Sequence, residues 1–331
     1  MVGKINPEMC FVDPITAPPS RKPSRDGFGK ALTELGESDP NVWAISADVS
    51  ESTRTHWFAE KFPERFVQVG VAEQNMAGIA SGIASCGKTV FISAYGVFSP
   101  GRNWDQVRVS ICYNDVPVHL HGSHTGVTVG ADGASHQALE DIAITRVLPN
   151  MTVLAPADME EARKATLAVA CLGHPSYMRT AREKLPMFTT ASTPFEIGKA
   201  NLCREGEDAA IFACGPQVYE SIIAAEKLEK EADISCAVVD SHTVKPIDEE
   251  AVLHWARRTG FIASVEDHQV DGGLGSAIAE VVTGKYPCTV KRHGIRNTFC
   301  QSGEPLDLMK HYGLDSDGIA RFVRDNFSKK K

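Results

Sequence analysis

A short apolar strand followed at once by a helix of small residues is the feature that most restricts how this chain can fold. The sequence predicts a strand over residues 66–69 and, after Gly70, a helix over residues 72–85. Open α/β sheets usually bind their ligands at such strand-to-helix corners. Glu73 falls in the first turn of this helix. Its carboxylate could bind a ligand there, or only interact with the helix dipole, which contributes roughly 0.3 to 1 kcal/mol.

The predicted helix that contains Glu73 is unusually thin, because most of its later residues have small side chains or none. Glycine costs roughly 1 kcal/mol relative to alanine inside a helix, so its use here needs a reason. Close approach of another backbone is the simplest one, and we expect the helix to be buried, at a subunit interface. The small residues are Ala77, Gly78, Ala80, Ser81, Gly82 and Ala84.

Composition limits the classes of function. The chain has 331 residues, of which 43% are hydrophobic and 23% charged, as in a globular protein of two domains. A net charge of -8 argues against a nucleic-acid partner. No apolar run approaches the ~20 residues that cross a bilayer, and the N-terminus lacks a signal-peptide pattern, so a cytoplasmic location is expected. The 9 cysteines form no C-x-x-C pair, which favours reduced thiols.

Helices and short apolar strands alternate along the chain, and this rhythm restarts once. The predicted elements include a strand over residues 42–46 and helices over 105–113 and 249–259. The rhythm predicts two consecutive three-layer α/β domains with mostly parallel sheets. The expected boundaries are an N-terminal arm over residues 1–24, a first domain over 25–188, a linker over 189–196 and a second domain over 197–331.

Polar residues gather where predicted strands of the first domain end. Because the carboxyl ends of parallel strands share one edge of a sheet, residues distant in sequence can meet in one crevice. The residues concerned are Asp48, Ser50, Ser52 and Arg54, then Glu73, then Tyr95, Phe98 and Arg102, and finally His124, Asp132 and His136.

Two of these groups allow more than one interpretation. His121, His124 and Asp132 could hold zinc, but their spacing matches no helical ligand pair, and sugar hydroxyls or phosphates suit the histidines better. Tyr95 and Phe98 could stack on a flat heterocycle or fill the core of their own domain.

Three motifs together resemble one enzyme family. They are VGVAEQNMAGIASGIASCG (69–87), GADGASHQALEDIAITRVLPNMTVLAPAD (130–158) and EDHQVDGGLGSAIAEV (266–281). They closely resemble the pyrimidine-binding and C-terminal domains of transketolases and of the related deoxyxylulose-phosphate synthases. The resemblance covers nearly the whole chain from about residue 24.

The resemblance implies a thiamin diphosphate enzyme of which this chain holds one part. In the family a separate domain binds the diphosphate through Mg2+, and the nearest similar text here, Asp271-Gly272 with Asn297, lies within the C-terminal-domain match. We therefore expect the C-terminal subunit of a split transketolase that moves a two-carbon ketol unit from a phosphorylated ketose to an aldose. An N-terminal subunit would supply the Mg2+ ligands, none being expected here, in a dimer of heterodimers that self-associates through the pyrimidine domain. This chain alone should be inactive.

The resemblance also assigns roles to single residues. Glu73 matches the glutamate that activates the cofactor's aminopyrimidine, with His136 as a second catalytic candidate. Cofactor contacts are implied for Tyr95, Phe98, Arg102 and Asp48, although one extra residue separates Phe98 from Arg102 here. Substrate contacts are implied for the remaining set, which is His124, Asp132, His136, Arg25, Ser52 and Arg182.

Other assignments remain open from the sequence. The beta subunit of a 2-oxo-acid dehydrogenase has the same layout, but that branch shows a glycine run where this chain has GADGASHQ. A deoxyxylulose-phosphate-synthase-like enzyme generally lacks the histidine that matches His124. A non-catalytic regulatory paralogue would not be expected to keep Glu73, His124, Asp132 and His136 together. The sequence does not name the sugars.

Overall fold

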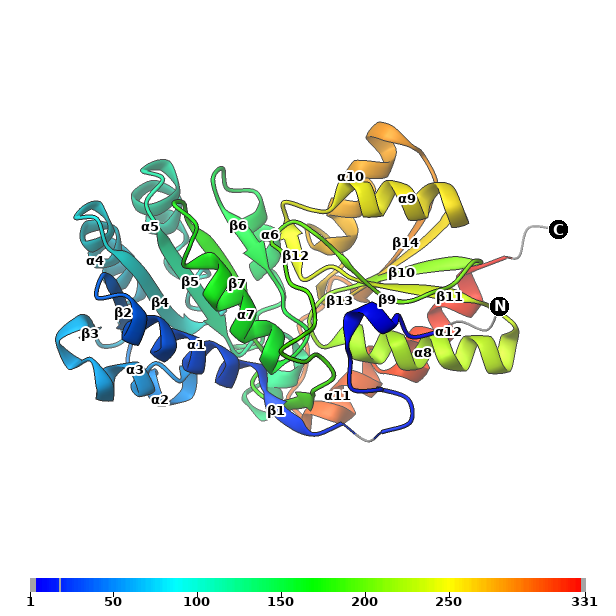
Figure 1. The fold of residues 1–331 in the computed structure, drawn as a ribbon, viewed down its shortest axis with the longest axis horizontal. Coiled ribbons are helices and arrows are strands. Elements are labelled where there is room, and N and C mark those ends of the chain that lie inside the picture. The colour runs from blue at the N-terminus through cyan, green and yellow to red at the C-terminus, as the bar shows by residue number, and fades with distance from the viewer. Residues whose placement is uncertain (1–3, 18, 329–331) are drawn as a thin grey trace.

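The computed structural model describes residues 4–17 and 19–328, which form two α/β domains side by side (Figure 1). Each domain is built on a mostly parallel sheet, so the predicted fold class is confirmed. The residues 1–3 and 18 of the predicted arm, and the last residues 329–331, lie outside the described part of the chain.

The first sheet runs parallel except at one edge, where β12 pairs antiparallel with β6. In spatial order its strands are β12 (Thr243–Lys245), β6 (Thr152–Leu154), β7 (Ser176–Arg179), β5 (Val118–Ser123), β4 (Thr89–Tyr95), β2 (Val42–Ser46) and β3 (Phe66–Gln68).

Alternate residues of the central strands enter different cores, which explains why helices cover both faces of this sheet. Phe91 on β4 packs with the core beneath the first helix, whereas its neighbour Ile92 packs with the core beneath α4. The helices of this domain are α1 (Ser24–Ser38), α2 (Ser50–Thr53), α3 (His56–Lys61), α4 (Glu73–Ser85), α5 (Trp104–Gln106), α6 (Asp141–Arg146) and α7 (Met159–Val169).

Shorter helical pieces complete the first domain. The single helix predicted over residues 105–113 is instead α5 followed by a π-helical segment, η3 (Val107–Tyr113). The other short pieces are the 3-10 turns η2 (Pro63–Arg65) and η4 (Val127–Asp132), the latter with a kink at Gly130, whereas the turn η1 (Pro7–Met9) belongs to the N-terminal arm.

The second sheet follows the same plan with an antiparallel strand, β9, at one edge. Its strands in spatial order are β14 (Thr289–Ile295), β13 (Phe261–Gln269), β10 (Ala209–Ala213), β11 (Cys236–Asp240) and β9 (Asn201–Arg204). Its helices are α8 (Gln217–Ala232), α9 (Glu249–Thr259), α10 (Leu274–Lys285), α11 (Pro305–His311) and α12 (Ser316–Asn326).

Two chain segments cross between the domains, and neither crossing was predicted. β12 belongs by sequence to the second domain but joins the first sheet (Figure 1). The N-terminal arm, drawn in dark blue, lies against the second domain, where Asn6 N–H donates to the Cys203 carbonyl at 2.9 Å. The arm then pairs through β1 (Arg21–Pro23) with β8 (Lys184–Pro186), just before α1 begins the first domain.

Candidate functional site

The carboxyl ends of the first sheet bring most of the predicted site residues into contact. β2, β4, β5 and β7 are parallel neighbours and end at one edge, and Glu73 enters beside them at the start of α4. A continuous series of contacts runs from Glu73 to Arg25 along this edge. Its members are Glu73, Arg102, Phe98, His136, Tyr95, His124, Arg25 and Ser52.

Glu73 is a buried carboxylate, with only 2% of its surface exposed. Its Oε2 accepts a hydrogen bond of 2.7 Å from Nη1 of Arg102, a charge-assisted contact. Asn103 Nδ2 donates to the Glu73 carbonyl oxygen at 3.2 Å and fixes the start of α4. Because the Arg102 side chain is 45% exposed, it can leave Glu73 without unfolding the site.

Aromatic rings line the edge next to this ion pair. Tyr95 lies nearly parallel to Phe98, with ring centroids 5.9 Å apart, and stacks on His124 at 3.9 Å. The His136 ring meets the edge of Phe98 at 5.5 Å, and the Arg102 guanidinium lies 4.5 Å from the Phe98 centroid. These rings therefore face the site rather than serving only as core.

His124 has a fixed tautomer. Arg25 Nη1 can only donate, so His124 Nε2 accepts from it at 3.1 Å, and His124 Nδ1–H donates to Ser123 Oγ at 2.9 Å. Burial, with the neighbouring Arg25 adding to the effect, lowers the pKa of His124 to about 3. The imidazole is therefore neutral at physiological pH and acts as a hydrogen-bonding group, not as a general acid.

Arg25 is a half-buried cation whose hydrogen bonds are incomplete. Its Nη1 donates to the Ser52 carbonyl oxygen at 2.8 Å, while its Nε is buried and has no acceptor among the described residues. Leaving a buried donor unpaired costs about 1 to 3 kcal/mol, more for a charged group. Burial, followed by the nearby Arg54, lowers the pKa of Arg25, and Arg182 adds to the effect. Three guanidinium groups near one another favour an anion-binding position beside Arg25.

Arg182 and Asp132 lie next to this position. Arg182 Nη1 donates to the Val129 carbonyl at 2.8 Å and to Asp132 Oδ2 at 3.2 Å. Both side chains remain about one-third exposed. Asp48 lies at the same edge and is exposed, with a positive φ of 63°, and its backbone N–H donates to Gln68 Oε1. Its predicted cofactor contact remains a prediction.

The sequence allowed His121 to be a zinc ligand, but in the structure this residue has a structural role. Its ring stacks on Phe28 with centroids 3.7 Å apart, and its two nitrogens bond to Ser93 and Thr180 at 2.8 Å each. Within the described part of the chain, no group of three or more His, Cys, Asp or Glu side chains is placed to hold a metal ion.

Some neighbours of the site were not singled out from the sequence. Asp26 follows Arg25 on α1, and its Oδ1 accepts from Arg54 Nε at 2.7 Å. Asn103 anchors Glu73 through the backbone. Asp26 belongs to no motif that would have identified it from the sequence. Asn103 could have been found, because it follows Arg102 in the loop that was already selected for its aromatic residues.

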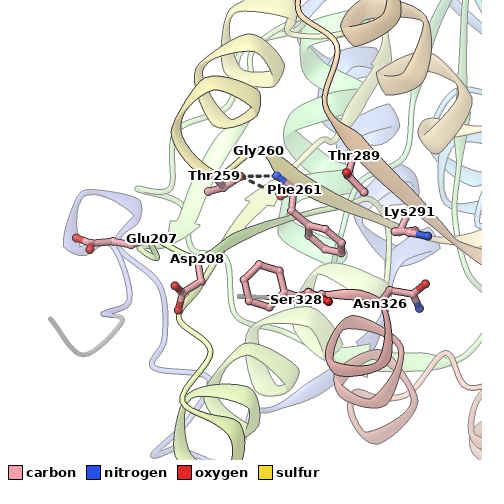
Figure 2. Close-up of a pocket in the computed structure, with 10 residues that line it drawn as sticks. Glu207, Asp208, Thr259, Gly260, Phe261, Thr289, Lys291, Asn326 and Ser328 are labelled. Atoms are coloured by element: carbon pink, nitrogen blue, oxygen red, sulfur yellow. Dashed lines mark hydrogen bonds between the residues drawn. The ribbon is translucent and has the colours of Figure 1, made fainter. Parts of the chain in front are cut away.

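A separate surface cavity of about 470 Å3 lies far from this edge along the second sheet. It opens at the amino ends of β10, β13 and β14, with Glu207 and Asp208 on one side and Lys291 on the other (Figure 2). Because the site described above lies at carboxyl ends of the first sheet, this cavity is not part of it.

Comparisons with known proteins decide the family. The sequence profile of the transketolase pyrimidine-binding domain matches residues 21–187, and that of the transketolase C-terminal domain matches residues 198–319. This chain belongs to the transketolase family. The prediction of the pyrimidine-binding and C-terminal part of a transketolase is thereby confirmed.

Similar proteins include chains of the same extent as this one. A protein named as a transketolase C-terminal section, from Methanocaldococcus jannaschii, is 42% identical over 93% of this chain and 97% of its own. A 6-deoxy-6-sulfo-D-fructose transketolase subunit from a Clostridium species is 36% identical, over 91% and 93% of the two chains. A solved structure described as a split-gene transketolase in an inactive β4 tetramer has a TM-score of 0.86 and 40% identity, covering 93% of this chain and 99% of that one.

These relatives place the chain among transketolase-type enzymes, as predicted. The family implies thiamin diphosphate as the cofactor. The residues present fit one end of it: a buried carboxylate beside stacked aromatic rings suits a flat, nitrogen-containing ring. Among residues 4–17 and 19–328, no three or more His, Cys, Asp or Glu side chains are placed together as ligands of a metal ion. In the same residues, no helix is long and apolar enough to cross a membrane.

Proposed function

We propose that this chain transfers a two-carbon ketol unit from a phosphorylated ketose to an aldose, together with a partner chain that carries a diphosphate- and Mg2+-binding domain. The observation that carries the proposal is the continuous series of contacts from Glu73 to Arg25. It joins a carboxylate for the cofactor's ring to a cation for the substrate's anionic end on one sheet edge.

Glu73 is proposed to hold a ring nitrogen of the aminopyrimidine. When bound, thiamin diphosphate supplies the carbon nucleophile that attacks a ketose carbonyl. Only Oε2 of Glu73 is bonded to Arg102, at 2.7 Å, so the ring nitrogen would bond to Oε1 or take the place of the guanidinium. The carboxylate then stabilises a proton on the ring nitrogen, in a buried environment where such a charge-assisted hydrogen bond is strong.

The histidines are proposed to bind and orient the sugar. His124 is neutral, with Nδ1–H donating to Ser123, and its Nε2 is proposed to exchange the Arg25 contact for a sugar hydroxyl near the aromatic rings. His136 makes T-shaped ring contacts with Tyr95 and Phe98, the rings proposed to face the cofactor, and is the second catalytic candidate. Asp132, held by Arg182, is proposed to accept a sugar hydroxyl.

Arg25, Arg182 and the α2 turn at Ser52 are proposed to bind the terminal anion of the substrate. The nearness of Arg25, Arg54 and Arg182 supports an anion there, and a guanidinium suits both phosphate and sulfonate oxygens. We propose a phosphate. The similar subunit named for a sulfonated fructose makes the sulfonate the alternative, which paired substrates would distinguish.

Self-association is proposed through the outer face of α4. Gly78 and Gly82 lie one turn apart, and a side chain built on either would meet nothing within 4 Å in the single chain. The thin helix predicted to be buried is therefore open on this face, as a subunit interface would require. The relative solved as a β4 tetramer supports assembly, and a dimer of heterodimers is the proposed active form. We also propose that the complex is cytoplasmic.

The cofactor site is proposed to be divided between this chain and its partner, and this division predicts weak cofactor binding by the isolated chain. Because the metal and diphosphate contacts are assigned to the partner, calorimetry should detect little or no Mg2+-dependent binding of thiamin diphosphate to this chain alone. Addition of the partner chain should produce a clear, Mg2+-dependent binding heat. Tight Mg2+-dependent binding without the partner would overturn this division of the site.

A further inference from the structure

The segment that carries the proposed sugar-binding residues is built against the second domain. We call residues 124–136 the histidine loop, since His124 and His136 begin and end it. Val127 in this loop and Leu139 just beyond it share a small apolar core with Leu308, Met309 and their neighbours. The loop therefore lies over α11 and the segment that leads into it, near the lower edge of the molecule in Figure 1.

One carboxylate of the second domain holds the first part of the histidine loop. Asp267, near the end of β13, is 3% exposed, and its two oxygens accept from the Val127 N–H at 3.0 and 3.1 Å. Gly126 has a φ of +76°, and a Cβ on it would lie 1.8 Å from Asp267 Oδ2. Only glycine allows the loop to approach this carboxylate so closely.

The backbone of Asp267 is held by a residue of the first domain. Arg179, at the end of β7, donates to the carbonyl oxygens of Asp267 at 3.0 Å and of Ala138 at 3.3 Å. Its other side forms an ion pair of 3.1 Å with Asp141. Burial raises the pKa of the Asp267 carboxyl to about 6, so it is an anion at pH 7.5.

The far end of the loop has its own attachment. Gln137 is 3% exposed, and its Nε2 donates to the Gln301 carbonyl oxygen at 3.2 Å. Gly133, at a φ of +72°, lies against Ser302, where an added Cβ would stand 2.4 Å from the serine oxygen. Both ends of the loop are thus positioned by residues of the second domain.

We propose that Asp267 is a positioning residue, by which the second domain fixes the histidine loop and so sets the places of His124, Asp132 and His136 for the donor sugar. The part of this proposal that concerns sugar binding rests on the proposed function. The proposed role of the second domain is therefore to hold a loop of the site in shape, while the groups that would touch substrate stand on the first domain.

The test is Asp267→Asn in the full chain at pH 7.5. Asparagine has nearly the same shape but has only one carbonyl oxygen, and its amide hydrogens would repel the Val127 N–H. Amide hydrogen exchange over residues 124–137 should become about tenfold faster in the isolated variant. With the partner chain present, the KM for the donor ketose should rise about tenfold, with a smaller change in kcat.

A matched control breaks a different contact between the domains. Glu280 on α10 forms a two-pronged ion pair with Arg146 on α6, with oxygen–nitrogen distances of 2.6 and 3.1 Å, away from the histidine loop. Glu280→Gln should leave both the loop exchange and the donor KM at wild-type values. If Asp267→Asn does not fold, Gln137→Ala removes the hydrogen bonds to the carbonyl oxygens of Gln301 and Val127, at 3.2 and 3.5 Å, and should speed exchange in the loop.

The outcomes separate this proposal from the proposed function. Wild-type loop exchange and donor KM in Asp267→Asn would overturn the positioning role. A lower melting temperature with unchanged exchange and KM would also overturn it, because Asp267 would then only join the domains. If the wild-type pair transfers no ketol unit, the proposed function fails, yet hydrogen exchange still tests whether Asp267 holds the loop.

Discussion

Replacing Glu73 by glutamine is expected to abolish nearly all ketol transfer while leaving the fold intact. Glutamine keeps the size of the side chain and can still bond to a ring nitrogen, but it carries no negative charge to stabilise a proton there. Acid–base and charge contributions of this kind are worth about a hundredfold to ten-thousandfold, and we expect kcat to fall about a thousandfold. The measurement is kcat with saturating thiamin diphosphate and the partner chain present.

The control for this variant is a carboxylate with an arginine partner elsewhere in the same domain. Glu34 on α1 pairs with Arg163 at 2.7 Å, outside the series of site contacts. Glu34→Gln should therefore keep wild-type turnover, since exposed ion pairs contribute at most about 1 kcal/mol to stability. Full activity in Glu73→Gln, with its circular dichroism spectrum unchanged, would refute the role assigned to Glu73.

Replacing Arg25 by methionine is expected to weaken binding of phosphorylated substrates selectively. Methionine keeps much of the stem and removes the guanidinium whose buried Nε lacks an acceptor. Losing one partner of a buried charged contact costs about 2 to 5 kcal/mol, so KM for an aldose phosphate should rise about a hundredfold. KM for the same aldose without its phosphate should rise much less, since that substrate loses only the indirect effect of Arg25 on His124.

Two further variants make the Arg25 result specific. Arg25→Lys keeps the charge but not the planar fork, and should fall between wild type and methionine. Arg163→Met removes an arginine that pairs with Glu34 and Glu160 away from the site, and should not change either KM. An equal rise in both KM values for Arg25→Met would show that Arg25 supports the site's structure and does not bind the anion. A preference of the wild type for sulfonated over phosphorylated ketoses would correct the substrate class.

Local pattern predicted the elements of this fold well. The strand over residues 42–46 and the helix over residues 249–259 have the predicted bounds, and α4 begins at Glu73, one residue from the prediction. These segments have strong periodicity and clear end signals, such as Asp248 at the start of α9. The shared edge of the parallel strands then placed most of the candidate residues together.

Long-range pairing was less accessible from the sequence. β9, β12 and the arm strand β1 are three to four residues long and all pair antiparallel, with β9 and β12 at the edges of their sheets. Such short strands carry too little pattern to indicate which sheet they join. Asp267 illustrates the same limit in the site, because nothing local shows that its carboxylate accepts from Val127, 140 residues away.

The most direct test of the central claim is ketol transfer by the reconstituted pair. This chain is mixed with a chain that carries the transketolase diphosphate-binding domain, thiamin diphosphate and Mg2+, and the transfer from a phosphorylated ketose to an aldose is followed. We predict transfer only when both chains are present, in a complex that contains two copies of each. No transfer from any phosphorylated ketose, together with decarboxylation of a 2-oxo acid by the same complex, would contradict it, and a complex without either activity would make this chain a non-catalytic paralogue.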